Sequence, residues 1–298
     1  MASTINVTAL PEYVNQISDD LLVKSMFGAK TLEYVEIMPN VKKVSALNYL
    51  DSSIVLADGT ACGFNAQGSD VFTQRQIEVK PLKVNKEWCE RDLLPTWMNH
   101  QLLIEAGRET LPFEQKIVDA NMKAIENALE KAIWQGNGVI EGFLEVLSDA
   151  ADDTIDVSVA DGATMADKVE AVYLAIPGEV LEKNPLIFMS YTDFRKYVNE
   201  INANCCANRP IVDANTRDYA YVGDSRVTIV PVGGLEGAGV IVAGARDNFV
   251  YATDVEDAHA TYKLWYSDDA DLFRFKVLFN AGVQVKFPSE IVIYEDLN

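Results

Sequence analysis

The chain of 298 residues is long enough for one large domain or two ordinary ones, and its 49% hydrophobic and 23% charged side chains are typical of globular proteins. Its formal net charge of −20 repels nucleic acid and argues against a protein that reads DNA or RNA directly. The sequence has no apolar run near the ~18 residues that a membrane helix needs, and its start lacks a signal-peptide pattern. Four cysteines without metal-ligand spacing favour synthesis in a reducing cytoplasm.

The first 38 residues are predicted to form an arm, in which "PEYVNQISDDLLVKSMFG" has apolar residues at helical spacing. Two strand-like segments follow at residues 41–56 and 71–88, separated by the turn-rich stretch "ADGTACGFNAQGSD". Together they predict a long hairpin. Because two strands alone are only marginally stable in water, and much of the polar alternation has no core to face, we expect this hairpin to lie against another subunit.

Residues 111–135 have the clearest helical pattern in the sequence. Thr110 is a candidate N-cap, Pro112 falls in the first turn and Gly136 ends the pattern. The expected apolar stripe consists of Phe113, Ile117, Ala124, Ile125, Ala128, Leu129, Ala132 and Ile133. A helix of this length extends for about 37 Å at ~1.5 Å per residue, so we expect it to act as a spine.

Residues 165–254 alternate between helical and strand-like patterns, which indicates an α/β or α+β domain. "MADKVEAVYLAIPGEVLE" and "YTDFRKYVNEINAN" are predicted helices, and "NPLIFMS", "RVTIVPV", "GVIVAGA" and "NFVYATD" are predicted strands. The last stretch, "LFRFKVLFNAGVQVKFPSEIVIYE", is predicted to form two strands around "NAG". Pro288 restricts the second of these strands to a sheet edge or a late start.

The sequence offers no catalytic, cofactor-binding or metal-binding residues that we can name. The glycine-rich "VGGLEGAGVIV" lies between two strands and not before a helix, so it predicts a turn and not a nucleotide loop. Neither His100 nor His259 has a local nucleophile pattern beside it. "SDDAD" and "ADDTID" lack the spacing of a calcium loop and are interpreted as solvated loops.

The order of arm, long hairpin, spine helix, mixed domain and closing strands resembles the major capsid proteins of tailed bacteriophages, which have the Hong Kong 97-type shell fold. Three stretches carry the resemblance. They are "GFNAQGSDVFTQRQIEVKPLKVNKEWCERDLLPTW", "LPFEQKIVDANMKAIENALEKAIWQGN" and "ARDNFVYATDVEDAHATYKLWYSDDADLFRFKVLFNAGVQVKFPSEIVIYE". The resemblance covers most of the chain from about Val41 onward.

The resemblance implies an α+β chain with this fold. The expected parts are an N-terminal arm at 1–38, an extended hairpin loop at 39–92, a peripheral domain at 93–150 with the spine helix at 111–135, an axial domain at 151–254, and closing strands of the peripheral domain at 255–298. The sequence begins with Met and has only about 40 residues before the hairpin, so we expect no cleaved scaffolding domain. No motif marks a Lys–Asn cross-link.

The implied function is a major capsid protein that assembles through pentamers and hexamers into the icosahedral shell around a phage genome. The implied partners are the protein itself, a portal, separate scaffolding or decoration proteins, and double-stranded DNA enclosed without sequence preference. We expect assembly in the bacterial cytoplasm, a final location in the virion, no membrane contact and no enzymatic activity. Phe64 and Phe72, near the hairpin tip, are predicted intersubunit contacts because exposed aromatic side chains there favour aggregation.

Three other interpretations stay open. An encapsulin-like nanocompartment shares the shell fold and stores a cargo enzyme. An α/β enzyme with the hairpin as a lid requires convergent catalytic groups. A tail or other virion protein forms rings or tubes in place of closed shells.

Overall fold

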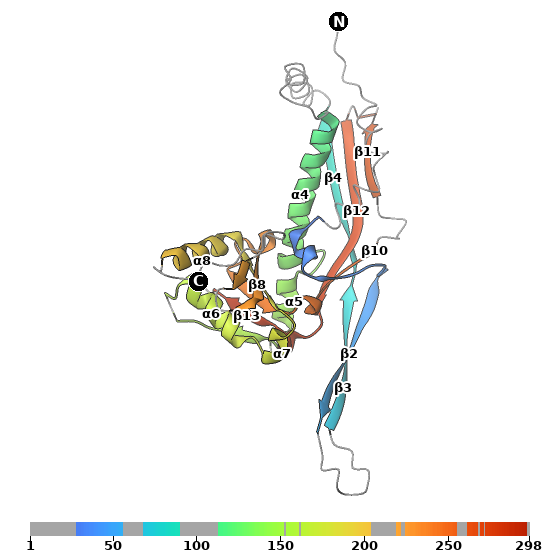
Figure 1. Ribbon diagram of the computed structural model, residues 1–298. Coiled ribbons are helices and arrows are strands. Elements are labelled where there is room, and N and C mark those ends of the chain that lie inside the picture. Colours follow the sequence, from blue (N-terminus) through green and yellow to red (C-terminus); the bar gives the residue numbers. More distant parts are fainter. Residues whose placement is uncertain are drawn as a thin grey trace.

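The computed structural model describes residues 28–55, 68–89, 113–151, 153–160, 162–203, 219–221, 224–254, 261–267, 269–270 and 272–296. These residues form a five-stranded sheet, a six-stranded sheet and a two-stranded hairpin. Figure 1 shows an elongated molecule, in which the hairpin projects from one end of the long sheet and the six-stranded sheet lies to one side with its helices.

The helical elements are η1 (Lys30–Glu33), α4 (Phe113–Gln135), α5 (Phe143–Asp149), α6 (Met165–Ala175), α7 (Gly178–Leu181), α8 (Tyr191–Ala203), η2 (Gly233–Leu235), η3 (Arg246–Asn248) and η4 (Pro288–Glu290). The strands are β1 (Glu36–Met38), β2 (Val44–Ile54), β3 (Gly68–Glu78), β4 (Lys80–Cys89), β5 (Ile155–Val157), β6 (Leu186–Ser190), β7 (Tyr219–Tyr221), β8 (Asp224–Val232), β9 (Val240–Gly244), β10 (Phe249–Asp254), β11 (Thr261–Ser267), β12 (Leu272–Val285) and β13 (Val292–Glu295).

The five-stranded sheet is built on β12, which has 14 residues and pairs along its length with three other strands. β4 lies along one edge of β12, while β10 and β11 follow one another along the other edge, and β1 pairs with β10. Alternate side chains of β12 from Phe273 to Val285 are buried, as expected for a strand with one covered face. The α4 helix runs beside this long sheet (Figure 1) and closes the core on that side.

The six-stranded sheet has the strand order β5-β13-β9-β6-β8-β7 and is covered on both faces. On β6, Ile187 and Met189 pack with α6 and α8, while Leu186 and Phe188 pack into the cluster that contains α4 and α5. Every residue of β6 and β9 is buried. This explains why both strands appear in the sequence as short continuous apolar runs.

The spine helix is confirmed over the residues that the structure describes, Phe113 to Gln135, while residues 111 and 112 lie outside them. Its length is about 35 Å at ~1.5 Å per residue. The buried side is only partly the one expected, because Ala124 and Ala128 are exposed. The buried apolar residues follow a 3–4 spacing and are Val118, Met122, Ile125, Leu129 and Ile133, with Ala132 and Trp134 beside them.

The prediction of two strands around "NAG" was wrong, because β12 passes through Asn280, Ala281 and Gly282 without a break. Gly282 is needed for a close approach and not for a turn: a Cβ at this position would lie 2.1 Å from the Glu78 carbonyl oxygen, where β3 meets β4. The predicted long helix over 165–182 is two helices, α6 and α7, separated at Pro177.

The chain passes from one sheet to the other at residues that differ from the predicted domain boundaries. β10, placed at the end of the 151–254 range, lies in the five-stranded sheet, whereas β13, placed in the closing 255–298 range, pairs with β5 and β9 in the six-stranded sheet. Residues 29–35, placed in the arm, are part of the main core, and β1 follows them in the five-stranded sheet. The reason is pairing between distant segments, which local patterns do not reveal.

Candidate assembly surface

The two faces of the five-stranded sheet have different surroundings. The inner face, with Phe273, Phe275, Val277 and Phe279 of β12, packs against α4 and is buried. The outer face carries the alternate residues of the same strands. Its environment changes along the sheet, from a covered part near the hairpin to an open part near β11.

The covered part of the outer face lies under the base of the β2–β3 hairpin. Val250 and Ala252 of β10 are fully buried there, and they pack with Val41, Leu47, Ile77 and Val79 from the hairpin base and its flanks. Backbone hydrogen bonds fix the same region: the Val79 N–H donates to the Lys43 carbonyl at 2.8 Å, and the Val41 N–H donates to the Thr253 carbonyl at 3.2 Å. The hairpin base is therefore part of the body.

Three ion pairs lie at or near the hairpin base. The Arg75 guanidinium lies 3.7 Å from the Asp153 carboxylate, and the Lys80 ammonium lies 3.5 Å from Glu78 and 3.7 Å from Glu141. These are long, exposed ion pairs, each worth little by itself. The direction of the hairpin therefore depends mainly on the apolar base and the backbone pairing.

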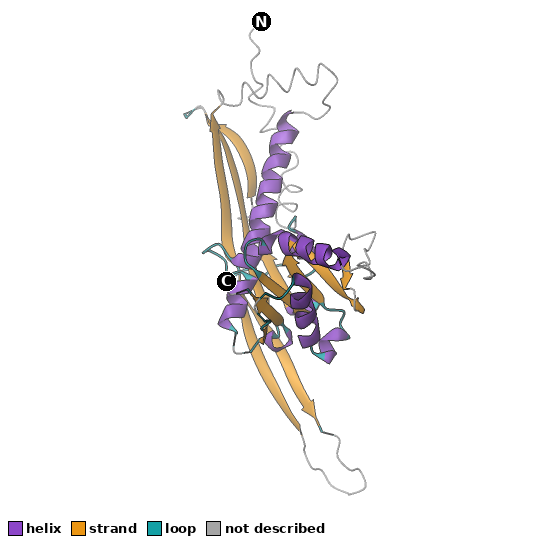
Figure 2. Cartoon of the chain, turned by 90° about the vertical axis from the view of Figure 1, so that its left-hand side faces the viewer, coloured by secondary structure: helices purple, strands orange, loops and turns teal. Residues whose placement is uncertain are grey.

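Beyond its base the hairpin has no partner strand among the described residues. β2 and β3 pair in antiparallel register from Val44↔Glu78 to Ile54↔Gly68, so each contributes 11 residues, about 36 Å at ~3.3 Å per residue. Figure 2 shows this pair extending away from both sheets. A two-stranded ribbon of this length that pairs with no third strand among the described residues is marginal in water, which makes it a candidate for contact with a second molecule.

The predicted contact residues lie in or beside this ribbon. Phe72 is in β3, where its backbone pairs with Leu50. Phe64 lies outside the described residues. Their assignment as intersubunit contacts therefore stays a prediction.

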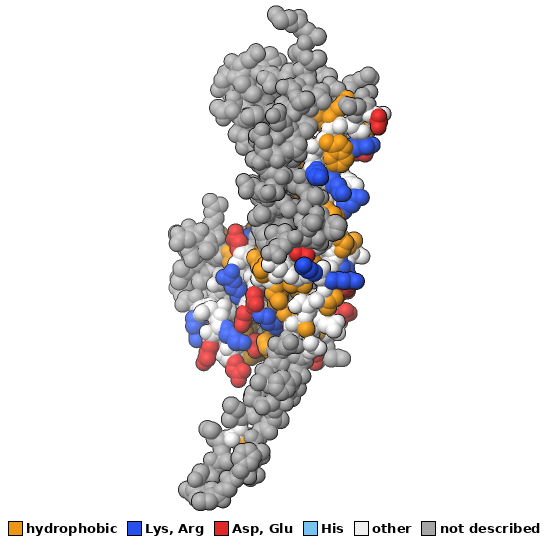
Figure 3. All heavy atoms as spheres, turned by 90° about the vertical axis from the view of Figure 1, so that its right-hand side faces the viewer, with side chains coloured by type: hydrophobic (Ala, Val, Ile, Leu, Met, Phe, Trp, Pro, Cys, Tyr) orange, Lys and Arg blue, Asp and Glu red, His pale blue; other side chains and the backbone are white. Residues whose placement is uncertain are grey.

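The open part of the outer face carries a group of cations that we call the basic face: Lys83 of β4, Lys263 of β11, and Arg274 and Lys276 of β12. Register places them on one side, because Lys276 lies directly opposite Lys263, and Lys83 lies opposite Leu278. Trp265, 38% exposed, lies opposite Arg274. In Figure 3, which looks onto this side, Lys and Arg side chains gather along the strands beside hydrophobic groups.

The basic face is electrostatically unfavourable in the isolated chain. Like charges directly opposite each other on neighbouring strands destabilise the pairing, and Lys263 faces Lys276 in this way. Among the described residues, the ion pair that forms on this face joins Arg274 Nε to Glu87 at 3.2 Å, and neither Lys263 nor Lys276 has one. An acidic partner on this face relieves the repulsion. Sequence reasoning missed the face because its cations come from three separate segments.

A cleft of about 660 Å³ between α5, α6 and β13 is the place where the enzyme interpretation can be tested. Its cation, Lys168, is paired with Asp296 at 2.6 Å, and this hydrogen bond raises the pKa of Lys168 above its usual value. A lysine with a raised pKa stays protonated and is a poor base or nucleophile. The described part of the cleft contains neither histidine nor cysteine. Lys168 is therefore not suited to act as a base or nucleophile in this cleft.

The described residues also contain no group of three or more side chains able to hold a metal ion, and none of their helices is apolar and long enough to cross a bilayer. Cys89 is a free, partly buried thiol. His100, His259 and the other three cysteines lie outside the described residues.

Comparison with known proteins gives a clear result at the level of structure. Neither a protein-family model nor a curated protein sequence matches the chain. Among solved structures, the satellite phage P4 procapsid including size determination (Sid) protein matches with a TM-score of 0.62 and 14% identity, covering 99% of this chain and 92% of the other. The chain has the Hong Kong 97-type capsid fold.

Other solved structures with this fold are also similar. A chain of Microbacterium phage Oxtober96 matches with a TM-score of 0.58 and 12% identity, over 90% of both chains. The virus-like particle from Pyrococcus furiosus matches with a TM-score of 0.54 and 11% identity, over 95% of this chain and all of the other. The α+β class and the capsid fold expected from the sequence are therefore confirmed.

Proposed function

We propose that the chain is the major capsid protein of a tailed phage, which assembles through pentamers and hexamers into an icosahedral shell around the genome. The observation that carries this proposal is a capsid fold over nearly the whole chain together with a long hairpin that pairs with no further strand among the described residues. In a closed symmetric assembly, every subunit offers the same surface to the hairpin of a neighbour. The many weak contacts then add up to a stable shell.

The hairpin of one subunit, in this proposal, lies on the basic face of a neighbour. Residues 44–74 contain Asp51, Asp58 and Asp70 and no Lys or Arg. Among the described residues, the basic face carries four cations and one carboxylate, Glu87, so the two surfaces are complementary in charge. Their lengths also agree, since the hairpin strands and the 10-residue β4 are both more than about 30 Å long.

The remaining partners belong to the same proposal. Double-stranded DNA is enclosed without sequence recognition, as the net charge of −20 favours, and a portal together with separate scaffolding or decoration proteins completes the particle. The shell assembles in the bacterial cytoplasm and functions in the virion. The chain itself performs no catalysis.

A nanocompartment shell is the second candidate function. The virus-like particle from Pyrococcus furiosus shares the fold at a comparable similarity, so the fold supports a nanocompartment shell as well as a phage capsid. The two candidates differ in what the shell contains, which is a genome in one case and a cargo protein in the other.

Electron microscopy of the purified full-length chain after sizing chromatography tests the proposal. Closed polyhedral shells, or rings of five and six subunits, are the expected result, and nucleic acid or cargo protein co-purified from the native source then distinguishes the two candidates. A chain that stays monomeric at high concentration, even when co-expressed with the neighbouring genes of its own genome, contradicts the shell function.

A further inference from the structure

A short loop joins the C-terminal end of the spine helix α4 to α5. It contains Asn137 and Gly138, which form the only Asn–Gly pair in the sequence, and both residues are exposed. Because glycine has no Cβ, its backbone nitrogen approaches the side-chain amide of the preceding residue more closely than the nitrogen of any other residue. The pair is therefore a candidate site for a reaction within the chain, in which this nitrogen attacks the side-chain carbon Cγ.

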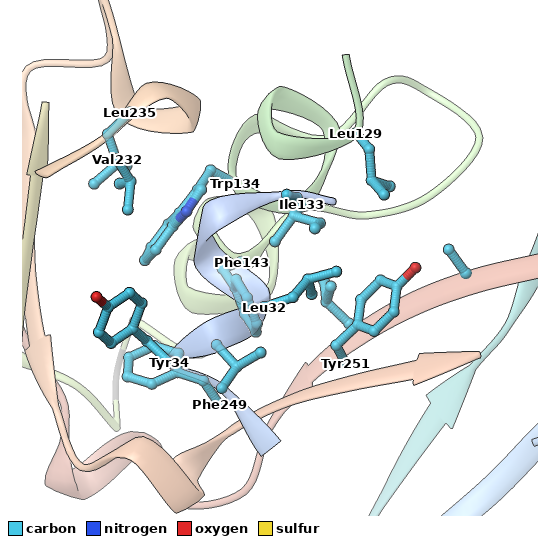
Figure 4. Close-up of a cluster of buried hydrophobic side chains, with 14 of the residues drawn as sticks. Leu32, Tyr34, Leu129, Ile133, Trp134, Phe143, Val232, Leu235, Phe249 and Tyr251 are labelled. Carbon is cyan, nitrogen blue, oxygen red and sulfur yellow. The ribbon is translucent and has the colours of Figure 1, made fainter. Parts of the chain in front are cut away.

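Buried residues fix the loop at both of its ends. Trp134 near the end of α4 and Phe143 at the start of α5 are fully buried, with ring centres 5.4 Å apart, and Figure 4 shows them in one apolar cluster. Within the loop, the Asn137 N–H donates to the carbonyl of Ile140 at 3.3 Å, and Ile140 is itself buried. The loop is thus a closed turn that leaves Asn137 and Gly138 exposed.

Two backbone donors act on the side-chain amide of Asn137. The Val139 N–H donates to Oδ1 at 2.9 Å, and the Ile140 N–H donates to the same oxygen at 3.0 Å. Both bonds stabilise negative charge on Oδ1, which is the charge that develops when a nucleophile adds to Cγ. The turn therefore supplies Asn137 with the equivalent of an oxyanion hole.

The attacking nitrogen and the leaving nitrogen are both free. Among the described residues, neither the Gly138 N–H nor the Asn137 Nδ2 donates a hydrogen bond. Gly138 has a φ of +76°, and apart from its chain neighbours no heavy atom lies within 4 Å of the place that a Cβ would take there. Solvent hydroxide can therefore remove the proton from the Gly138 nitrogen, and ammonia can leave into solvent.

We propose that Asn137 is a self-modification site, at which attack by the Gly138 nitrogen converts the side-chain amide into a carboxylate. The bond from this nitrogen to Cγ forms and the Cγ–Nδ2 bond breaks, so that Nδ2 leaves as ammonia with, in total, the proton that Gly138 has lost. The five-membered imide then takes up one water. The reaction consumes only water, concerns a single chain and does not depend on the shell function.

The imide opens in two ways with different consequences for the loop. Cleavage of the new bond at Cγ gives aspartate at residue 137, whereas cleavage of the original peptide bond gives isoaspartate and lengthens the main chain by one carbon inside the closed turn. Both products place a carboxylate at the C-terminal end of α4, where the helix dipole disfavours it.

The charged side chains that the structure places at the loop are Glu141, Glu145 and Lys80. Glu145 Oε2 accepts from the Gly142 N–H at 3.1 Å, and Glu141 lies 3.7 Å from the Lys80 ammonium. The new carboxylate at residue 137 finds no further cation among these groups. The modification therefore adds charge to a loop that is already acidic.

Mass spectrometry of the full chain, incubated at pH 8 and digested with trypsin, tests the proposal. The peptide 132–168 contains Asn137 as its single asparagine, so a gain of about one dalton, located by fragment ions, reports the reaction. The peptide 124–131 contains Asn127, an exposed residue of α4 that precedes alanine, and is the internal control. Peptide 132–168 is expected to split into separate aspartate and isoaspartate forms, while peptide 124–131 stays unchanged.

Two variants and one further comparison sharpen the test. Asn137→Gln is expected to abolish the conversion, and Gly138→Ala to slow it severalfold, because a Cβ hinders the approach of the nitrogen. The wild-type rate is also compared with that of the same chain unfolded in urea, which requires no variant to fold. The folded chain is expected to react at least as fast, because the two donors to Oδ1 act only in the folded loop. A slower reaction in the folded chain, or equal conversion of peptides 132–168 and 124–131, overturns the proposal.

Discussion

The six-stranded sheet and the β2–β3 hairpin differ in composition and in what covers them: β6 and β9 are continuous apolar runs, whereas β2 and β3 mix polar and apolar residues. Every residue of β6 and β9 is buried between helices on one face and the α4 cluster on the other. Among the described residues, β2 and β3 of the hairpin pair with each other and with no further strand. The first region is stabilised within one chain, whereas the second requires a surface that a second chain supplies.

The same contrast divides the outer face of the five-stranded sheet. Its lower part is sealed by the hairpin base, with Val250 and Ala252 fully buried, and its upper part presents the basic face. Apolar burial therefore stabilises the body, while the open face has a composition suited to an acidic partner. Substitutions in the two regions are expected to act on different measurements.

The largest effect on stability is expected in the covered region, for Phe188→Ala. Phe188 of β6 is fully buried, with ring centres 5.0 Å from Trp134 and 5.4 Å from Phe249. Removing a buried ring leaves a cavity and lowers the free energy of unfolding by about 3–5 kcal/mol. Urea unfolding of the unassembled chain measures this loss.

Trp265→Ala is the matched control, an aromatic residue removed from the open face. Trp265 is 38% exposed, and its loss is expected to lower the free energy of unfolding by about 1–2 kcal/mol, clearly less than the loss at Phe188. Similar losses for the two variants contradict the division into a covered and an open region.

A smaller effect of opposite sign is expected for Lys276→Glu in the basic face. The substitution replaces a like-charged cross-strand pair with an attractive one opposite Lys263, so the free energy of unfolding of the isolated chain rises by about 0.2–1 kcal/mol.

The same change removes a cation that the acidic hairpin contacts in our proposal, so shell yield in electron microscopy decreases. Lys131→Glu, an exposed residue on α4, is the charge-matched control and leaves the yield unchanged. Unchanged yield for Lys276→Glu refutes the proposed docking face.

Much of the fold follows from local patterns in the sequence. The spine helix and the buried strands β6, β8, β9 and β10 lie where period and composition place them. These elements are regular and long, or short and uniformly apolar, so their signals are local. The second hairpin strand, predicted at residues 71–88, was wrong in its extent: the range holds two strands, β3 in the hairpin and β4 in the five-stranded sheet, because β4 pairs with the distant β12. Gly282 shows the limit of such signals, because its role is contact with Glu78, more than two hundred residues away in the chain.

The candidate surfaces were less predictable for the same reason. Lys83, Lys263 and Lys276 belong to separate segments, and only strand register brings them to one face. The hydrogen bonds from Thr31 to Glu130 of α4 join residues about one hundred positions apart, and neither residue has a local pattern that marks it. Local sequence patterns predict helices and strands. Which polar groups are buried, and which charges share one face of a sheet, depends on how distant segments pair.

The smallest effect on the stability of the isolated chain is expected for Phe72→Asp in the hairpin, which nevertheless blocks assembly if the hairpin is an intersubunit element. A substitution in a ribbon without a core changes the free energy of unfolding by about 0.5 kcal/mol or less, while a new carboxylate prevents an apolar contact with a neighbour. Urea unfolding and electron microscopy of the same preparation separate the two effects. Thr73→Asp introduces the same charge one position further along β3, on the opposite face of the strand, and serves as the control. A folded Phe72→Asp chain that forms normal shells eliminates Phe72 as a contact, and a loss of shells in both variants assigns the effect to added charge and not to the aromatic ring.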